Sequence, residues 1–120
     1  MYKIASRNVP IFNATVVKIE GFIDPSANKK QPLHFELEKI ILSGYKSIII
    51  NVEKLMFNSF HFGVFIIVAD FINERGGKCL ILKASKKLRL LFLTLGIEDF
   101  FYFFNDEYQA FDFLKDNGFV

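Results

Sequence analysis

The stretch KSIIINVEKLMFNSFHFGVF, residues 46–65, decides the fold class. Its first part, residues 46–52, is a short continuous apolar run, which is typical of a strand buried on both faces of a parallel sheet. The longer apolar segment over residues 60–75 exceeds the usual length of a strand and ends at Gly76-Gly77, so we expect a helix there. A buried strand followed directly by a helix predicts an α/β protein.

The same two patterns recur on both sides of this stretch. β-branched and apolar runs predict strands, whereas apolar residues at helical spacing predict helices, one of which has Ser85 as its N-cap. The further elements are strands over 2–7, 14–20, 78–84 and 100–104 and helices over 32–43, 85–95 and 106–116. The order β-β-α-β-α-β-α-β-α predicts a mixed, largely parallel sheet with an N-terminal hairpin and about four helices. We expect one domain spanning residues 1–120.

Apolar spacing also predicts which side of each helix is buried. The expected buried positions are Val64, Ile67, Val68, Phe71 and Ile72 in one helix, Leu88, Leu91, Phe92 and Leu95 in the next, and Tyr108, Phe111 and Leu114 in the last. Leu90 and Leu93 lie away from the face that contains Phe92, so the helix over 85–95 is apolar almost all round. Such a helix is either fully buried or covered by a partner, and we expect Leu90 and Leu93 to form a contact surface.

Composition excludes several classes of protein. Hydrophobic residues make up 52% of the 120 residues, which excludes a disordered chain. A net charge of +2 gives no indication of a nucleic-acid surface. Asp70 interrupts the longest apolar segment before it reaches the roughly 20 residues of a membrane span. Cys79 is the single cysteine and lies in an apolar run, so we interpret it as a buried strand residue in a cytoplasmic protein.

The sequence contains no recognisable catalytic set. The two histidines, His34 and His61, lack the spacing of metal ligands, and no glycine-rich phosphate loop is present. We therefore predict a non-enzymatic protein without a metal or a cofactor. The 16 phenylalanines leave one weaker alternative, a carrier that holds a lipid or small ligand in an apolar groove.

Three motifs together resemble those of a known family. They are GFID at residues 21–24, NVEKLMFNSFHFGV at 51–64 and LLFLTLGIEDFF at 90–101. Their order and spacing resemble the STAS domain (sulfate transporter and anti-sigma factor antagonist) in its single-domain bacterial form, and the resemblance covers nearly the whole chain. In that family the second motif usually reads aspartate-serine-serine-glycine-x-glycine.

The resemblance implies a regulator of transcription that works by partner switching. Such proteins bind an anti-sigma factor with kinase activity and so release a sigma factor. Phosphorylation of the second serine in the motif abolishes this binding. The phosphate adds nearly two negative charges at a helix N-terminus, where the helix tolerates an anion but the partner surface need not.

This sequence departs from the family pattern at the phosphorylated position. Aligning Gly63 with the last glycine of the motif places Asn58 on the aspartate and Ser59 on the first serine. Phe60 then stands at the phosphoacceptor and His61 at the following glycine. Phe60 cannot be phosphorylated. A shift of one residue would instead bring Ser59 to the acceptor position, and Ser59 or Asn58 could also simply cap the helix.

We therefore expect a protein-binding surface around the second motif. Asp24 either makes a contact there, as the resemblance implies, or only turns the chain before Pro25. The expected partner-binding residues are Asp24, Asn58, Ser59, Phe60, His61 and Phe62, with Ser59 as the candidate phosphosite. The alternative function is a structural subunit that assembles as a homodimer, or in a larger complex, through Leu90 and Leu93 without any phosphorylation switch.

Overall fold

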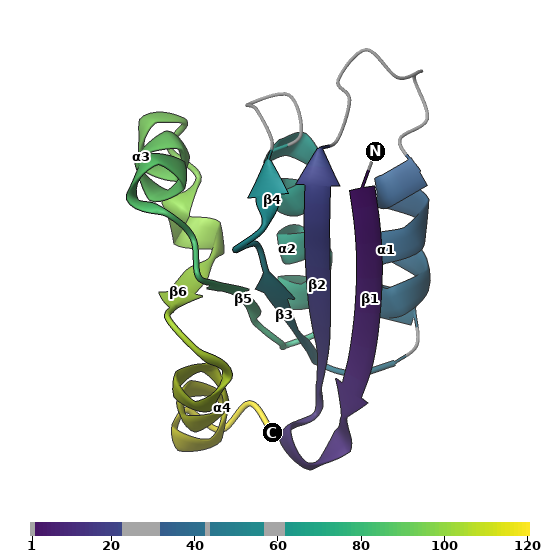
Figure 1. Cartoon of the computed structure of the whole chain (residues 1–120). Coiled ribbons are helices and arrows are strands. Elements are labelled where there is room, and N and C mark those ends of the chain that lie inside the picture. The colour runs from purple at the N-terminus through teal and green to yellow at the C-terminus, as the bar shows by residue number, and fades with distance from the viewer. Residues whose placement is uncertain (1, 23–31, 43, 57–61) are drawn as a thin grey trace.

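The computed structural model describes residues 2–22, 32–42, 44–56 and 62–120. Within these residues six strands form one sheet, shown in Figure 1. The strands are β1 (Tyr2–Val9), β2 (Ala14–Phe22), β3 (Ser47–Asn51), β4 (Leu55–Met56), β5 (Cys79–Leu82) and β6 (Tyr102–Phe104). The sheet order is β1-β2-β3-β5-β6, and β4 pairs with β2 beyond the end of β3. β1 and β2 are antiparallel, whereas the other pairs are parallel, so the expected mixed sheet with an N-terminal hairpin is confirmed.

Four α-helices and two short 3₁₀ turns connect and cover these strands in the described part of the chain. They are α1 (Pro32–Leu42), α2 (Phe62–Glu74), α3 (Lys86–Thr94) and α4 (Glu107–Asp116), with η1 (Pro10–Phe12) and η3 (Glu98–Phe100). Buried residues of α1, α2 and α3 share one hydrophobic cluster, and buried residues of α4 belong to a second cluster. Figure 1 shows α1 and α2 side by side along the sheet and α4 near the C-terminus.

The two central strands are buried on both faces, as the continuous apolar runs predict. Ile48 and Ile50 belong to the cluster under α1 and α2, whereas Ile49 points to the cluster under α4. Cys79 is fully buried, and this burial raises the pKa of its thiol. Its interpretation as a buried strand residue is therefore confirmed.

Local capping signals in the sequence also agree with the structure. The Ser85 side chain accepts a hydrogen bond from the backbone N–H of Leu88 at 3.1 Å, which makes Ser85 the N-cap of α3. The Asp106 carboxylate caps α4 in the same way, by accepting from the N–H of Gln109 at 2.9 Å. Both caps satisfy backbone donors that have no partner inside the helix.

The predicted buried faces are partly wrong. Ile67 is 55% exposed, Phe71 is 40% exposed and Tyr108 is 82% exposed, although we expected all three to be buried. Leu95, just beyond the end of α3, is also exposed, at 43%. In α2 the buried residues are Phe62, Val64, Phe65, Val68, Ala69 and Ile72. Because α2 is apolar almost all round, its spacing alone could not decide which apolar residues face the sheet.

Candidate partner-binding surface

The ends of β2 and β4 bring the first two motifs together. Phe22 lies opposite Met56 in a parallel pair, and the N–H of Gly21 donates to the carbonyl oxygen of Lys54 at 2.9 Å. Asp24 and Asn58 each follow two residues after this pair of strand ends. Two segments that are far apart in the sequence therefore leave the sheet at adjacent positions, and the short strand β4 is the element that arranges this.

Five of the expected partner-binding residues lie outside the described residues. They are Asp24, Asn58, Ser59, Phe60 and His61. Their roles, including that of Ser59 as a cap or a phosphosite, stay predictions.

Phe62, the sixth expected residue, belongs to the core rather than to a partner surface. Its side chain is 2% exposed, and its ring lies edge-on to Phe92 with 4.8 Å between the centroids. Phe62 is the first residue of α2, so this contact fixes the start of the helix against α3. A side chain buried in this way cannot be reached by a partner, and the prediction that it contacts one is wrong.

Two exposed apolar residues mark the same end of the sheet. Phe22 is 44% exposed and Met56 is 67% exposed, at the last positions of β2 and β4. Sequence reasoning missed both residues. Their apolar character at the borders of the two motif segments was the available signal, because apolar residues at an exposed strand end often belong to a binding surface.

Charged side chains cover the neighbouring part of the sheet. Lys18 Nζ lies 3.1 Å from a carboxylate oxygen of Glu20, and Lys54 Nζ lies 4.0 Å from the same oxygen. The hydrogen bond from Lys18, and then its charge, lower the pKa of the Glu20 carboxyl. Lys18 and Lys54 are exposed and Glu20 is half-buried, so these ion pairs contribute little to stability.

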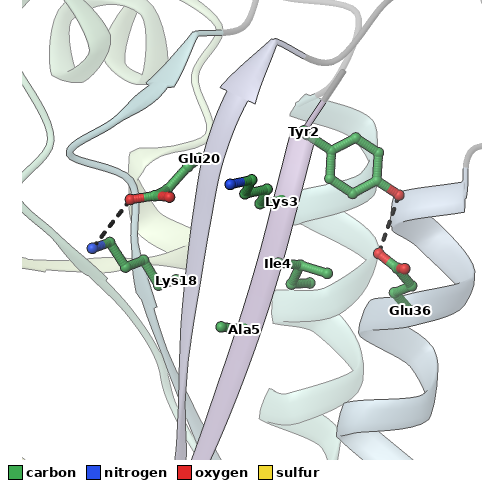
Figure 2. A pocket seen from close by; sticks show the side chains of 7 residues that line it. All are labelled: Tyr2, Lys3, Ile4, Ala5, Lys18, Glu20 and Glu36. Carbon is green, nitrogen blue, oxygen red and sulfur yellow. Dashed lines mark hydrogen bonds and ion pairs between the residues drawn. The ribbon is translucent and has the colours of Figure 1, made fainter.

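A hollow of about 540 Å³ lies at the outer edge of the sheet, along β1. Figure 2 shows two polar pairs in its wall, Tyr2 with Glu36 and Lys18 with Glu20. Strand alternation places them on opposite faces, because Lys3 pairs with Glu20 while Tyr2 points to the other side. The two pairs therefore do not converge on one substrate, and their geometry gives no support to a catalytic site.

Tyr2 provides a test of this edge of the sheet. Burial, the hydrogen bond to Glu36 at 3.1 Å and the charge of that carboxylate raise the pKa of Tyr2 to about 12. The unfolded chain loses this proton at a pH of about 10. The folded state then keeps a proton that the unfolded state has lost, so stability should fall as the pH rises from about 10 to 12.

An absorbance titration of tyrosinate, compared with that of Tyr2→Phe, should assign this late ionisation to Tyr2. Glu36→Gln should lower the pKa of Tyr2 only part of the way, because burial is the largest cause and remains. A Tyr2→Phe titration identical to that of the wild type would contradict this assignment.

Neither a metal centre nor a membrane-spanning helix is found in the described ranges. No group of three or more histidine, cysteine, aspartate or glutamate side chains among these residues could hold a metal ion. The helices of the same residues are too short or too polar to cross a bilayer.

The surface expected on α3 is exposed. Leu90 and Leu93 are each 59% exposed, while Leu88 and Phe92 of the same helix are buried. Leu90 and Leu93 lie apart from buried Leu88 and Phe92, as predicted, whereas Leu95, which we expected on the buried face, is exposed. Its use as an assembly surface stays a prediction.

Neither a protein-family model nor a curated protein matches the sequence. The anti-sigma factor antagonist SpoIIAA in its unphosphorylated form is similar in structure, with 22% identity, a TM-score of 0.72 and coverage of 98% of this chain and 99% of that chain. An anti-sigma factor antagonist from Mycobacterium paratuberculosis shares 12% identity at a TM-score of 0.79, covering 97% of this chain and 96% of that chain.

A third structure is that of RsbS from Moorella thermoacetica, in a serine-to-glutamate variant. It shares 18% identity at a TM-score of 0.76 and covers 98% of this chain and 99% of that chain. The chain therefore has the fold of the single-domain anti-sigma factor antagonists, which is the STAS-like fold that the resemblance predicted.

Proposed function

We propose that this chain is a non-enzymatic protein-binding module that acts as an anti-sigma factor antagonist. The observation that carries the proposal is the fold shared with SpoIIAA over 98% of the chain, with both motif segments leaving the sheet at the paired ends of β2 and β4. Exposed Phe22 and Met56 supply apolar surface at that position. The partner is a protein of the kinase-like anti-sigma factor class.

Phe60 changes how such a surface would be controlled. SpoIIAA has been solved in an unphosphorylated and a phosphorylated form. In this chain an apolar ring replaces the expected acceptor hydroxyl, so the surface keeps its apolar character and cannot be charged at that residue. We propose that binding is not switched by phosphorylation at Phe60, and that Ser59 is the nearest residue where a switch could act.

Calorimetric titration with the kinase-like anti-sigma factors of the same genome tests the proposal. The wild-type chain should bind one of them, and Phe60→Asp should weaken binding by about tenfold or more, because a charge would enter an apolar contact. Tyr108→Ser is the control, since Tyr108 is 82% exposed on α4, away from the ends of β2 and β4. Equal binding by the wild type and Phe60→Asp, or binding to none of these proteins, would contradict the proposal.

Incubation of the complex with ATP, followed by mass spectrometry of the wild type and Ser59→Ala, tests the switch. If Ser59 is phosphorylated and the phosphate lowers partner affinity, phosphorylation controls binding at Ser59, one residue before Phe60. If the chain stays unmodified and bound, the result supports binding that phosphorylation does not control.

A second candidate function is that of a structural subunit. The observation that favours it is the exposure of Leu90 and Leu93 on α3, each at 59%. The carrier alternative has less support. The apolar hollow between α1 and α2 has a volume of about 230 Å³, whereas pockets that enclose a ligand usually have at least about 300 Å³. The hollow of about 510 Å³ beside α3 has Lys86, Arg89 and Glu98 in its wall as well as Leu90, Leu93 and Phe103.

A further inference from the structure

Helix α2 exposes a stripe in which apolar and acidic residues alternate. Ile67, Asp70, Phe71 and Glu74 follow the spacing i, i+3, i+4 and i+7, which places them on one side of the helix. All four are exposed. Beside this stripe lies the hollow between α2 and α1, which is lined by Glu38, Ile41, Leu42, Ile67, Val68 and Phe71. The α1–α2 groove, as we call this surface, is therefore apolar at its centre, with Asp70 and Glu74 at its rim and the Arg75 guanidinium 5.5 Å from the centroid of the Phe71 ring.

Helix α3 exposes a stripe of opposite charge with the same spacing. Lys86, Arg89, Leu90 and Leu93 again follow i, i+3, i+4 and i+7, and all four are exposed. The Arg89 guanidinium lies 5.0 Å from the centroid of the Phe103 ring, which holds this charge beside the leucines. We call this surface the α3 stripe.

The two stripes match residue by residue when the helices run antiparallel. Their spacing is identical, so an antiparallel alignment brings equal sides of the two helices together, at heights that agree within one residue. The facing pairs are Glu74 with Lys86, Asp70 with Arg89, Phe71 with Leu90 and Ile67 with Leu93. Each acidic residue meets a basic one and each apolar residue meets a leucine. A parallel alignment exchanges the sides and loses this match.

We propose that the α3 stripe of one copy docks in the α1–α2 groove of a second copy. This is the helix-in-groove mode of recognition, in which apolar residues at i, i+3, i+4 and i+7 supply the anchors. Leu90 and Leu93 are the anchors, and Lys86 and Arg89 form the charged rim of the contact. The contact uses neither Phe22 nor Met56, so it is independent of the proposed partner-binding surface.

Charge decides between this head-to-tail contact and a symmetric one. Two α3 stripes facing each other would oppose the cations Lys86, Lys87 and Arg89 of one copy to those of the other. Two α1–α2 grooves would bring acidic residues together in the same way. Like charges across an interface are unfavourable, whereas opposite patches attract. Since each copy keeps one free groove and one free stripe, the contact can repeat and form a ring or a filament.

Sedimentation of two half-defective variants tests the proposal. Leu93→Asp should disable the stripe and leave the groove intact, whereas Ile67→Asp should disable the groove and leave the stripe intact. Both residues are exposed, and circular dichroism confirms that the variants fold. The wild type should assemble as its concentration rises, and each variant alone should stay monomeric. An equimolar mixture of the two should form a heterodimer that does not grow further.

Other results of this experiment would overturn the proposal. If the wild type stays monomeric at high micromolar concentration, copies of the chain do not dock on each other and the proposal is wrong. Self-association of Ile67→Asp alone would show a symmetric contact through α3 instead. A monomeric mixture of the two variants would show that stripe and groove do not bind each other.

A charge exchange gives a second, independent readout. Asp70→Arg and Arg89→Asp should each weaken association by about tenfold or more, because each places like charges opposite one another. The two changes combined in one chain should restore association, since Arg and Asp then face each other again. Tyr108→Ser should leave association unchanged. A double variant no better than the single ones would contradict the antiparallel pairing.

Discussion

Replacing Gly77 by alanine should lower the free energy of unfolding by about 3 kcal/mol or more. A Cβ atom on Gly77 would lie 1.7 Å from the carbonyl oxygen of Lys46 and 2.5 Å from its carbon. These are backbone atoms of the residue just before β3, so no side-chain rotation can relieve the overlap. The N–H of Gly77 also donates to the carbonyl oxygen of Ile72 at 3.0 Å, which holds the turn in place at the end of α2.

The same turn sets the pairing of the central strands. The N–H of Lys78 donates to the side-chain oxygen of buried Ser47 at 3.0 Å, and the next residue, Cys79, pairs with Ile48. A side chain on Gly77 would have to push β3 and β5 apart at the position where their register begins. The expected loss of stability therefore comes from the centre of the sheet and not from the turn alone.

Gly63→Ala is the matched control for this prediction. Gly63 lies in the first turn of α2, and, apart from its chain neighbours and the backbone of its own helix, no atom of the described residues lies within 4 Å of a Cβ built there. Alanine should be neutral or should stabilise the helix by up to about 1 kcal/mol. Urea denaturation of the wild type and both variants measures the difference. Variants at Gly63 and Gly77 with equal stability would show that the close approach at Gly77 is absent.

Local and strongly patterned features were predictable from the sequence. The run of Ile48 to Ile50 bounded by polar residues predicts a strand buried on both faces, and the structure buries it there. Ser85 before a helical segment is a capping signal that depends on neighbouring backbone alone. The alternation of such segments was enough to predict a largely parallel sheet.

Features that depend on distant parts of the chain could not be predicted. α2 carries apolar residues on nearly every side, so only its packing against α1 and the sheet decides that Phe65 is buried and Phe71 exposed. The two-residue strand β4 is too short to carry a pattern, yet it brings the ends of the first two motifs together. Phe62 was assigned to a partner surface because it lies at the helix start in the second motif, whereas Phe92, thirty residues further on, buries it.

Replacing Phe92 by alanine should cost about 3–5 kcal/mol of stability, the largest loss that we expect from a single side chain. Phe92 is 1% exposed and meets three other rings edge-on. The ring centroids lie 4.8 Å from Phe62, 5.0 Å from Phe101 and 5.2 Å from Phe103. Truncation removes these contacts and leaves a cavity between α2, α3 and the edge of the sheet, which the surrounding rings cannot fill without losing their own packing.

Leu90→Ala on the same helix is the control, measured at low protein concentration where copies of the chain stay apart. Leu90 is 59% exposed, so its truncation should change stability by no more than about 0.5 kcal/mol. A double-mutant cycle with Phe62→Leu and Phe92→Leu should give a coupling of about 0.5–1.5 kcal/mol. Because Phe62 begins α2, Phe92→Ala should also speed amide exchange in the first turns of that helix. Equal losses in Phe92→Ala and Leu90→Ala would mean that the ring cluster does not hold the start of α2, where the proposed partner surface adjoins the core.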